Sequence, residues 1–183
     1  MEKLLIFTAN PAIMKLIRLT AFSSLLFLLL TGLNSCEKDA EQKKTTDFSK
    51  SGIILSYAQV TPTPPVFSAA IGNLDVYYTR ETRLLTYTIT WSGLTGAVSK
   101  IEIHGPAPTG YATTGVVQTV IGTGGIVAAS ATLYPATGKF SGTLLVDGVY
   151  LKEQDLLNGL LYVDIHTAAN SATGEIRGQI RFQ

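Results

Sequence analysis

Residues 84–91 read LLTYTITW and give the clearest indication of the fold class. Its apolar side chains recur at every second position, with threonines between them. A period of two places alternate side chains on opposite faces of a strand, so the run is typical of a β-strand with one buried face. The expected core face consists of Leu85, Tyr87, Ile89 and Trp91. Trp91 is therefore expected in the core rather than on a surface platform for sugars.

Similar runs, each bounded by glycine, proline or polar turn residues, extend from Ile53 to the end of the chain. They cover residues 73–79, 99–105, 115–122, 125–134, 139–146, 160–167 and 174–182. Only residues 152–160 depart from this pattern, and their polar start and terminal glycine predict one or two helical turns with a glycine cap. Short strands at regular spacing predict an all-β fold, an antiparallel Greek-key-like β-sandwich with one short helical segment.

The composition excludes several classes of protein. The chain has 183 residues, 15% of them charged, and a formal net charge of +1. This balance lacks the basic surface that nucleic-acid binding needs. A single cysteine excludes an internal disulfide and any site with several cysteine ligands. The glycine-rich residues 122–125 lack the Lys-Ser/Thr pair of a phosphate-binding loop, and we interpret them as a turn.

The first 35 residues have the anatomy of a lipoprotein signal peptide. Lys15 and Arg18 precede an apolar run, and Met14 is a candidate for the true start. The run is shorter than the about 20 apolar residues of a membrane-spanning helix. Residues 33–36, LNSC, resemble a bacterial lipobox, in which cleavage leaves the cysteine as a lipid-modified first residue. We expect lipidation at Cys36 and a stable membrane anchor, because each buried methylene adds about 0.8 kcal/mol.

Residues 36–52 are rich in charge and poor in large apolar side chains, which predicts a flexible tether before a domain at residues 53–183. The acidic residues after Cys36 resemble the export tag of surface lipoproteins in the Bacteroidetes. This resemblance implies a protein of the bacterial cell envelope, attached to the outer membrane and facing either the periplasm or the cell surface.

Three stretches together resemble the CHRD domain, named from chordin and found in many bacterial secreted proteins. They are PPVFSAAIGNLDVYY (64–78), LTYTITWSGLTGAVSKIEIHGPA (85–107) and LLNGLLYVDIHTAANSATGEIRGQI (156–180). The resemblance implies an all-β extracellular module without an established enzymatic activity. Two positions depart from the family pattern: Glu102 replaces a histidine two places before His104, and Asp164 stands where asparagine is favoured.

The last two strands predict a hairpin whose polar residues can form a structural network. If residues 162–167 pair with residues 174–180, Asp164 lies opposite Arg177 and His166 opposite Glu175. Such cross-strand pairs contribute roughly 0.2–1 kcal/mol each. This structural interpretation accounts for the four polar residues without a catalytic or ligand-binding role, and the sequence favours it.

The alternative interpretation is a site for a metal or small ligand. Glu102 and His104 face away from the core, so a strand adjacent to the hairpin would bring them together with Asp164, His166 and Glu175. Histidine with carboxylates is a reasonable ligand set for zinc or copper. The IHG sequence after the turn also resembles a strand of copper-zinc superoxide dismutase. That enzyme needs several more histidines than the two present here, which excludes its redox chemistry.

The function expected from the sequence is a non-enzymatic module, with no resident cofactor, that binds a partner or supports the cell surface. A nucleophile-elbow sequence is absent, and no sequence pattern pairs a serine or threonine with a base that could activate it. The expected partners are the membrane, through Cys36, and an envelope or extracellular protein or a glycan. The alternative is a metal-binding protein that uses His104 and His166.

Overall fold

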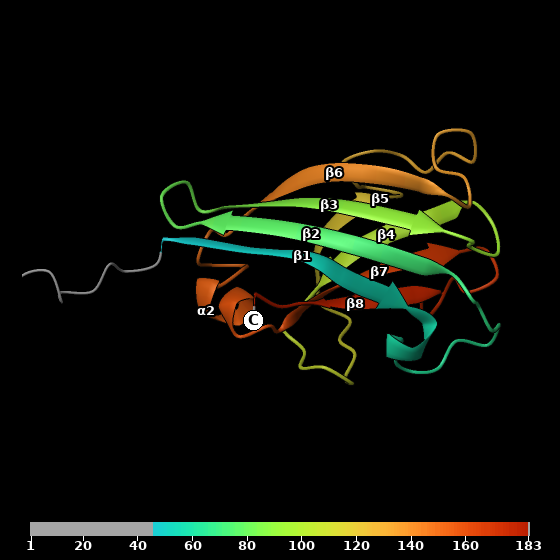
Figure 1. Cartoon of the computed structure of the whole chain (residues 1–183), viewed down its shortest axis with the longest axis horizontal. Helices are drawn as coiled ribbons and strands as arrows, with labels where there is room; N and C mark the ends of the chain where they lie inside the picture. The colour runs from blue at the N-terminus through green and yellow to red at the C-terminus, as the bar shows by residue number, and fades with distance from the viewer. Residues whose placement is uncertain (1–45, 183) are drawn as a thin grey trace, which may run out of the picture. The chain divides into compact units, whose positions relative to one another are not determined.

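The computed structural model describes residues 46–182 (Figure 1). The expected signal peptide, Cys36 and most of the expected tether lie outside the described residues. The described part contains eight strands, a 3-10 turn η2 (Tyr57–Gln59) and a short helix α2 (Glu153–Leu157). The strands are β1 (Asp47–Ser56), β2 (Ile71–Thr79), β3 (Leu84–Ser92), β4 (Val98–His104), β5 (Val116–Ile121), β6 (Gly138–Leu145), β7 (Leu161–Thr167) and β8 (Ile176–Ile180).

All eight strands belong to one sheet in the order β5-β4-β7-β8-β1-β2-β3-β6, and every neighbouring pair is antiparallel. Figure 1 shows β1, β2, β3 and β6 side by side as one layer, with β4, β5, β7 and β8 behind them. The two halves join where Ser56 of β1 pairs with Arg177 of β8. The predicted all-β antiparallel sandwich is confirmed, as a sheet that folds over on itself and nearly closes.

The core lies between the two layers, and β3 contributes the face predicted from its alternation. Leu85, Tyr87 and Ile89 are at most 1% exposed. Trp91 is 2% exposed, and its indole Nε1 donates a hydrogen bond to the carbonyl oxygen of Pro135 at 2.9 Å. A buried indole needs such an acceptor. Trp91 is therefore a core residue, as predicted.

The predicted helical segment is confirmed within residues 152–160. Leu156 of α2 is fully buried, and Gly159 ends the helix with a φ of +70°. That left-handed conformation costs glycine little, and the Gly159 amide donates to the carbonyl oxygen of Leu156 at 3.1 Å. Within the described part of the chain, no helix has the length and apolar character needed to cross a membrane.

The predicted strand at residues 125–134 is wrong. Apart from a single bridge between Val127 and Ile121, this segment is a connection between β5 and β6. The segment has small alanines and exposed apolar side chains, including Leu133 at 70% exposure. Neither face therefore packs well enough to stabilise a strand. Ser130 closes a turn instead, because its carbonyl oxygen accepts from the amide of Tyr134 at 2.7 Å and its hydroxyl from the amide of Leu133.

The predicted tether also extends too far. Strand β1 begins at Asp47, so residues 47–52 belong to the sheet and not to a tether. Most of these side chains are exposed, which is why the sequence shows no alternation there. Backbone pairing with β2 holds this part of the strand, from Asp47 opposite Thr79 to Lys50 opposite Val76. The pairing then shifts register at Gly52, whose φ is +76°.

Candidate metal centre

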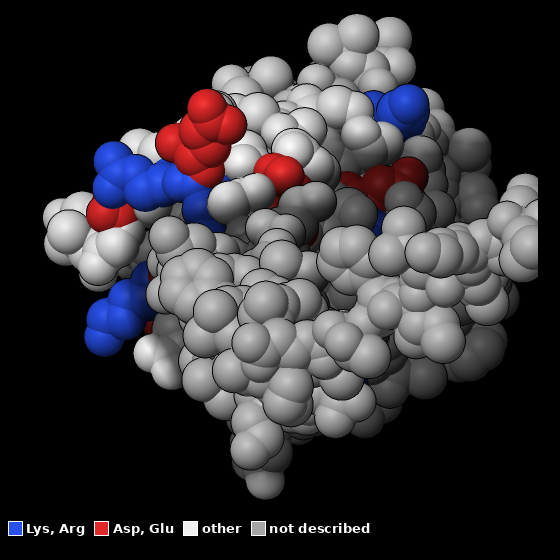
Figure 2. Space-filling model, turned by 60° about the vertical axis from the view of Figure 1, so that its left-hand side comes forward, with Lys and Arg blue, Asp and Glu red and all other residues white. Residues whose placement is uncertain are grey.

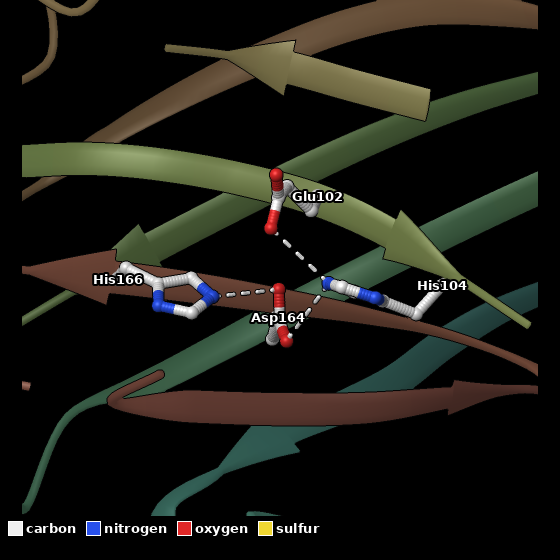
Figure 3. Close-up of side chains that lie close together, drawn as sticks. All are labelled: Glu102, His104, Asp164 and His166. Carbon is white, nitrogen blue, oxygen red and sulfur yellow. Dashed lines mark ion pairs between the residues drawn. The ribbon is translucent and has the colours of Figure 1, made fainter. Parts of the chain in front are cut away.

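The polar faces of β4 and β7 meet because these two strands are neighbours in the sheet. Glu102 lies opposite Asp164 in the antiparallel register, and His104 lies opposite Tyr162. The side chains opposite each other on one face are within contact distance. Glu102, His104, Asp164 and His166 therefore converge, and we call these four residues the metal centre (Figure 3).

One ligand atom from each residue of the metal centre lies within 4.8 Å of the others. The distance from His104 Nε2 to Glu102 Oε2 is 3.2 Å, and that to Asp164 Oδ2 is 3.5 Å. His166 Nε2 lies 3.0 Å from Asp164 Oδ1. Tetrahedral ligands at the usual zinc bond lengths lie about 3.3 to 3.4 Å apart. The three short spacings are close to this value, and the other separations are at most 4.8 Å, so a bound ion would draw the four ligands closer together.

Three histidine nitrogens of the metal centre are buried without a hydrogen-bond partner among residues 46–182: Nδ1 of His104 and Nε2 of both rings. His104 Nε2 and His166 Nε2 each lie near a carboxylate oxygen, but among residues 46–182 neither makes a well-directed hydrogen bond. Asp164 Oδ1 is in the same condition. A buried polar group without a hydrogen bond costs about 1–3 kcal/mol. A shared cation at the centre would satisfy both Nε2 atoms and Asp164 Oδ1 together, and would leave Nδ1 of His104 without a partner.

The tautomer of His166 is suited to a metal. Its Nδ1 lies 2.9 Å from the carbonyl oxygen of Ser171, an acceptor, so Nδ1 carries the proton in the neutral ring. The lone pair then resides on Nε2, the atom that points into the metal centre. A backbone carbonyl on the outer nitrogen is a usual support for a metal-ligating histidine.

The ring of His104 is held by stacking. It lies parallel to the ring of Tyr162, with an interplanar angle of 11° and centroids 5.1 Å apart. The guanidinium of Arg177 lies over Tyr162 as well, 3.5 Å from the ring centroid. The hydroxyl of Tyr162 donates to the carbonyl oxygen of Thr113, which ties this ring to the β4–β5 connection. These contacts fix the orientation of His104 before any ligand arrives.

The electrostatics of the metal centre attract a cation. Burial by itself lowers the pKa of His104, but Asp164 and Glu102 outweigh it and raise that pKa above its ordinary value. Burial acts to raise the pKa of Asp164, yet the contacts with His104 and His166 bring it below its ordinary value. The carboxylates that favour the protonated form of His104 would equally attract a metal ion, because metal and proton compete for the same nitrogen.

Glu102 has further partners on both sides. The Nζ of Lys100 lies 2.7 Å from Oε2, and the hydroxyl of Thr119 in β5 donates to Oε1 at 3.3 Å. Lys100 is not among the site residues expected from the sequence. Its position two residues before Glu102 could have identified it, because residues i and i+2 of a strand share a face.

Glu175 is not part of the metal centre. Of the two partners expected to orient His166, Glu175 or a nearby backbone carbonyl, the structure shows the carbonyl of Ser171. Glu175 is fully buried, and its carboxylate accepts hydrogen bonds from Ser68, Thr95 and Thr167. The register of β7 and β8 is as predicted, with Asp164 opposite Arg177. Among the described residues, however, the ion pairs of Asp164 join it to the two histidines. Arg177 instead donates to the carbonyl oxygen of Tyr111 and to Gln179.

The predicted outer face of the hairpin is buried. Asp164, His166 and Arg177 are 5%, 3% and 2% exposed, because connecting segments cover them. A cavity of about 440 Å³ remains above the metal centre, and its rim includes residues 61–62, 112–114 and 172–173. Over the described residues in Figure 2, basic and acidic side chains lie near one another rather than gather in one area of a single charge.

Comparison with known proteins gives one match. The family model of the CHRD domain matches residues 52–180, which is well over half of the chain. No curated protein and no solved structure is similar enough to the chain to count as a match. The matched range runs from the middle of β1 to the end of β8 and includes all four residues of the metal centre. The chain therefore belongs to the CHRD domain family.

Proposed function

We propose that the chain is a metal-binding module of the bacterial cell envelope, in which the metal centre holds one divalent transition-metal ion. The observation that carries this proposal is the convergence of four buried ligand atoms within 4.8 Å. Two of them, the Nε2 atoms of His104 and His166, lack a well-formed hydrogen bond among residues 46–182. The donor set has two imidazoles and two carboxylates.

This donor set favours zinc or divalent copper. Imidazole suits zinc, copper, iron and nickel, whereas carboxylates add affinity for harder divalent ions. Monovalent copper prefers the sulfur of cysteine and methionine. The cysteine and both methionines of the chain are Cys36, Met1 and Met14, all of which precede the described residues.

We propose a binding role rather than an enzymatic one. The inner nitrogens of both histidines face Glu102 and Asp164 rather than a serine or threonine hydroxyl. A nucleophilic mechanism would require the latter arrangement. On this view the module presents its bound metal to an envelope or extracellular partner, a protein or a glycan.

The metal content of the full chain, purified without an affinity tag, tests the proposal. We expect about one equivalent of a transition metal per chain after dialysis. His104→Ala and His166→Ala should each lower this to background, because each removes a nitrogen ligand. Glu81→Gln is the matched control, since Glu81 is exposed in the β2–β3 turn. A wild-type chain without metal, or histidine variants that retain it, would contradict the proposal.

The envelope location is a separate part of the proposal and is supported by the sequence LNSC at residues 33–36. Cys36→Ser should abolish lipid attachment and move the protein from the membrane fraction to the soluble fraction. Ser35→Ala keeps a small residue before the cysteine and should be processed normally. Cell fractionation measures both, and a Cys36→Ser protein that is processed normally and stays as firmly in the membrane fraction would rule out this anchor.

A further inference from the structure

Two cationic side chains line the cavity above the metal centre. Lys100 lies on β4 and Arg177 on β8, and both contribute to the cavity of about 440 Å³. Small-molecule sites have volumes of roughly 300–1,000 Å³. The cavity is therefore large enough for a small ligand beside a metal ion.

Arg177 is fixed in position and only partly satisfied. Its Nη2 donates to the carbonyl oxygen of Tyr111 at 2.8 Å and to Gln179 Oε1 at 3.1 Å, while its guanidinium stacks on Tyr162. The side chain is 2% exposed, and within residues 46–182 its Nη1 has no hydrogen-bond partner. Arg177 also has no ion pair with a carboxylate in that range. Burial lowers its pKa, which reflects the cost of this charge.

Metal binding would change the charge balance of the cavity. The titratable groups that line it are Lys100, Glu102, His104, Tyr162, Asp164, His166 and Arg177. When a metal is bound, both histidine ligands are neutral, and with Tyr162 also neutral the two carboxylates balance the two cationic side chains. A divalent ion then leaves an excess of two positive charges in a largely buried space. An unbalanced buried charge is costly, so the metal-loaded cavity should attract an anion.

We propose that the metal-loaded cavity binds a small oxyanion, a carboxylate or a phosphate, and that the metal-free cavity does not. The inference rests on the proposed metal binding. The anion would complete the coordination of the metal and accept a hydrogen bond from Nη1 of Arg177. A guanidinium is well suited to this contact, because a hydrogen bond between a charged donor and an oxyanion is stronger than one between neutral groups.

The test uses the full chain loaded with Co²⁺, whose visible absorption changes with its ligands. The loaded chain is titrated with acetate and, separately, with inorganic phosphate, and calorimetry repeats both titrations without metal. We expect at least one probe to bind the loaded chain tenfold or more tightly than the metal-free chain. By linkage, that probe should raise the affinity for Co²⁺ by the same factor.

Two arginine variants locate the anion. Arg177→Gln should still bind Co²⁺ but lose about tenfold in affinity for the probe. Arg181→Gln is the matched control, because Arg181 is exposed and does not line this cavity. It should bind the probe as the wild type does. If Arg177→Gln shows no cooperative unfolding, the coupling measured on the wild type decides the question alone.

The outcomes separate the two proposals. If the wild type does not bind Co²⁺, both the metal centre and the anion site are wrong. If the wild type binds Co²⁺ but neither probe binds the loaded chain more tightly than the metal-free chain, only the anion site is overturned. Equal probe affinities of the folded Arg177→Gln and Arg181→Gln variants would also overturn it. Preference for acetate assigns a carboxylate ligand, and preference for phosphate assigns a phosphate.

Discussion

Glu175 shows how a single buried charge can be stabilised without a counter-ion. Its carboxylate accepts from the hydroxyl of Ser68 at 2.6 Å and from the amide and hydroxyl of Thr95 at 2.8 and 2.6 Å. The hydroxyl of Thr167 is a further donor. Burial acts to raise the pKa of Glu175, but these donors outweigh it and leave that pKa below its ordinary value. The cluster ties the loop before β2 to the end of the β7–β8 hairpin.

Replacing Glu175 should therefore destabilise the fold. Glu175→Gln keeps the size of the side chain but removes the charge that orients the donors, and we expect a loss of about 2–3 kcal/mol in the free energy of unfolding. Urea denaturation at pH 7 measures this loss. Glu81→Gln should change it little, because Glu81 is exposed. A Glu175→Gln variant as stable as Glu81→Gln would show that the donors contribute nothing net.

The same carboxylate should give stability a pH dependence. Because its folded-state pKa is below 4.5, the contribution of Glu175 is fully present above that pH and declines as pH falls through the folded-state pKa. The stability difference between wild type and Glu175→Gln should thus shrink in acid. Urea denaturation from pH 7 to pH 3 checks this sign, and a difference that grows in acid would contradict it.

At the scale of elements, β8 is the strand that joins the two halves of the sheet. Gly178 of β8 packs closely against β1: a Cβ placed there would lie 2.9 Å from the carbonyl oxygen of Ile54 and 2.9 Å from side-chain atoms of Leu55. Real Cβ contacts are longer than this, so one of the two strands must shift to admit a side chain. The absence of a side chain at Gly178 allows the halves to approach.

Gly178→Ala should separate β8 from β1. Overpacking of this kind costs typically 1–3 kcal/mol, and we expect a loss of about that size in the free energy of unfolding. Gly96→Ala is the matched control, because a Cβ at Gly96 would meet nothing within 4 Å and its φ is not in the left-handed range. Thermal unfolding of both variants measures the difference. Equal midpoints would mean that β1 and β8 adjust freely.

At the scale of the whole molecule, the metal centre connects two strands far apart in sequence. β4 and β7 are separated by β5, β6 and α2, and their pairing is non-local. Anything that binds the folded chain and not the unfolded one adds to its stability. A metal bound across β4 and β7 should therefore stabilise the entire fold rather than only the hairpin.

Thermal melts with and without a chelator measure this effect. At a free metal concentration of 100 times Kd the gain is about 2.7 kcal/mol, which corresponds to a rise of roughly 5–10 °C in Tm for a chain of this size. The chelator should remove this rise in the wild type and in Glu81→Gln. His166→Ala should be insensitive to the chelator. A chelator-sensitive His166→Ala would place the stabilising metal elsewhere.

The amino-acid sequence alone was enough to predict most of the strands, the short helix, the family and the register of the last hairpin. These properties depend on local alternation, since a period of two specifies which face each side chain takes. Asp164 opposite Arg177 followed from that pattern, and so did the shared face of Glu102 and His104. Where side chains are exposed, as at residues 47–52, the pattern is absent and the strand could not be predicted.

The neighbours of each strand and the covered faces of the sheet became known from the three-dimensional fold. Alternation does not say that β4 lies beside β7, so the meeting of His104 with Asp164 and His166 was one of several arrangements. Nor does it say that loops bury the polar face or that Glu175 turns away to the threonines. Those outcomes depend on packing between segments that are distant in the sequence. The same polar residues are solvated by water when they are exposed, and they need one another or a ligand when they are buried together.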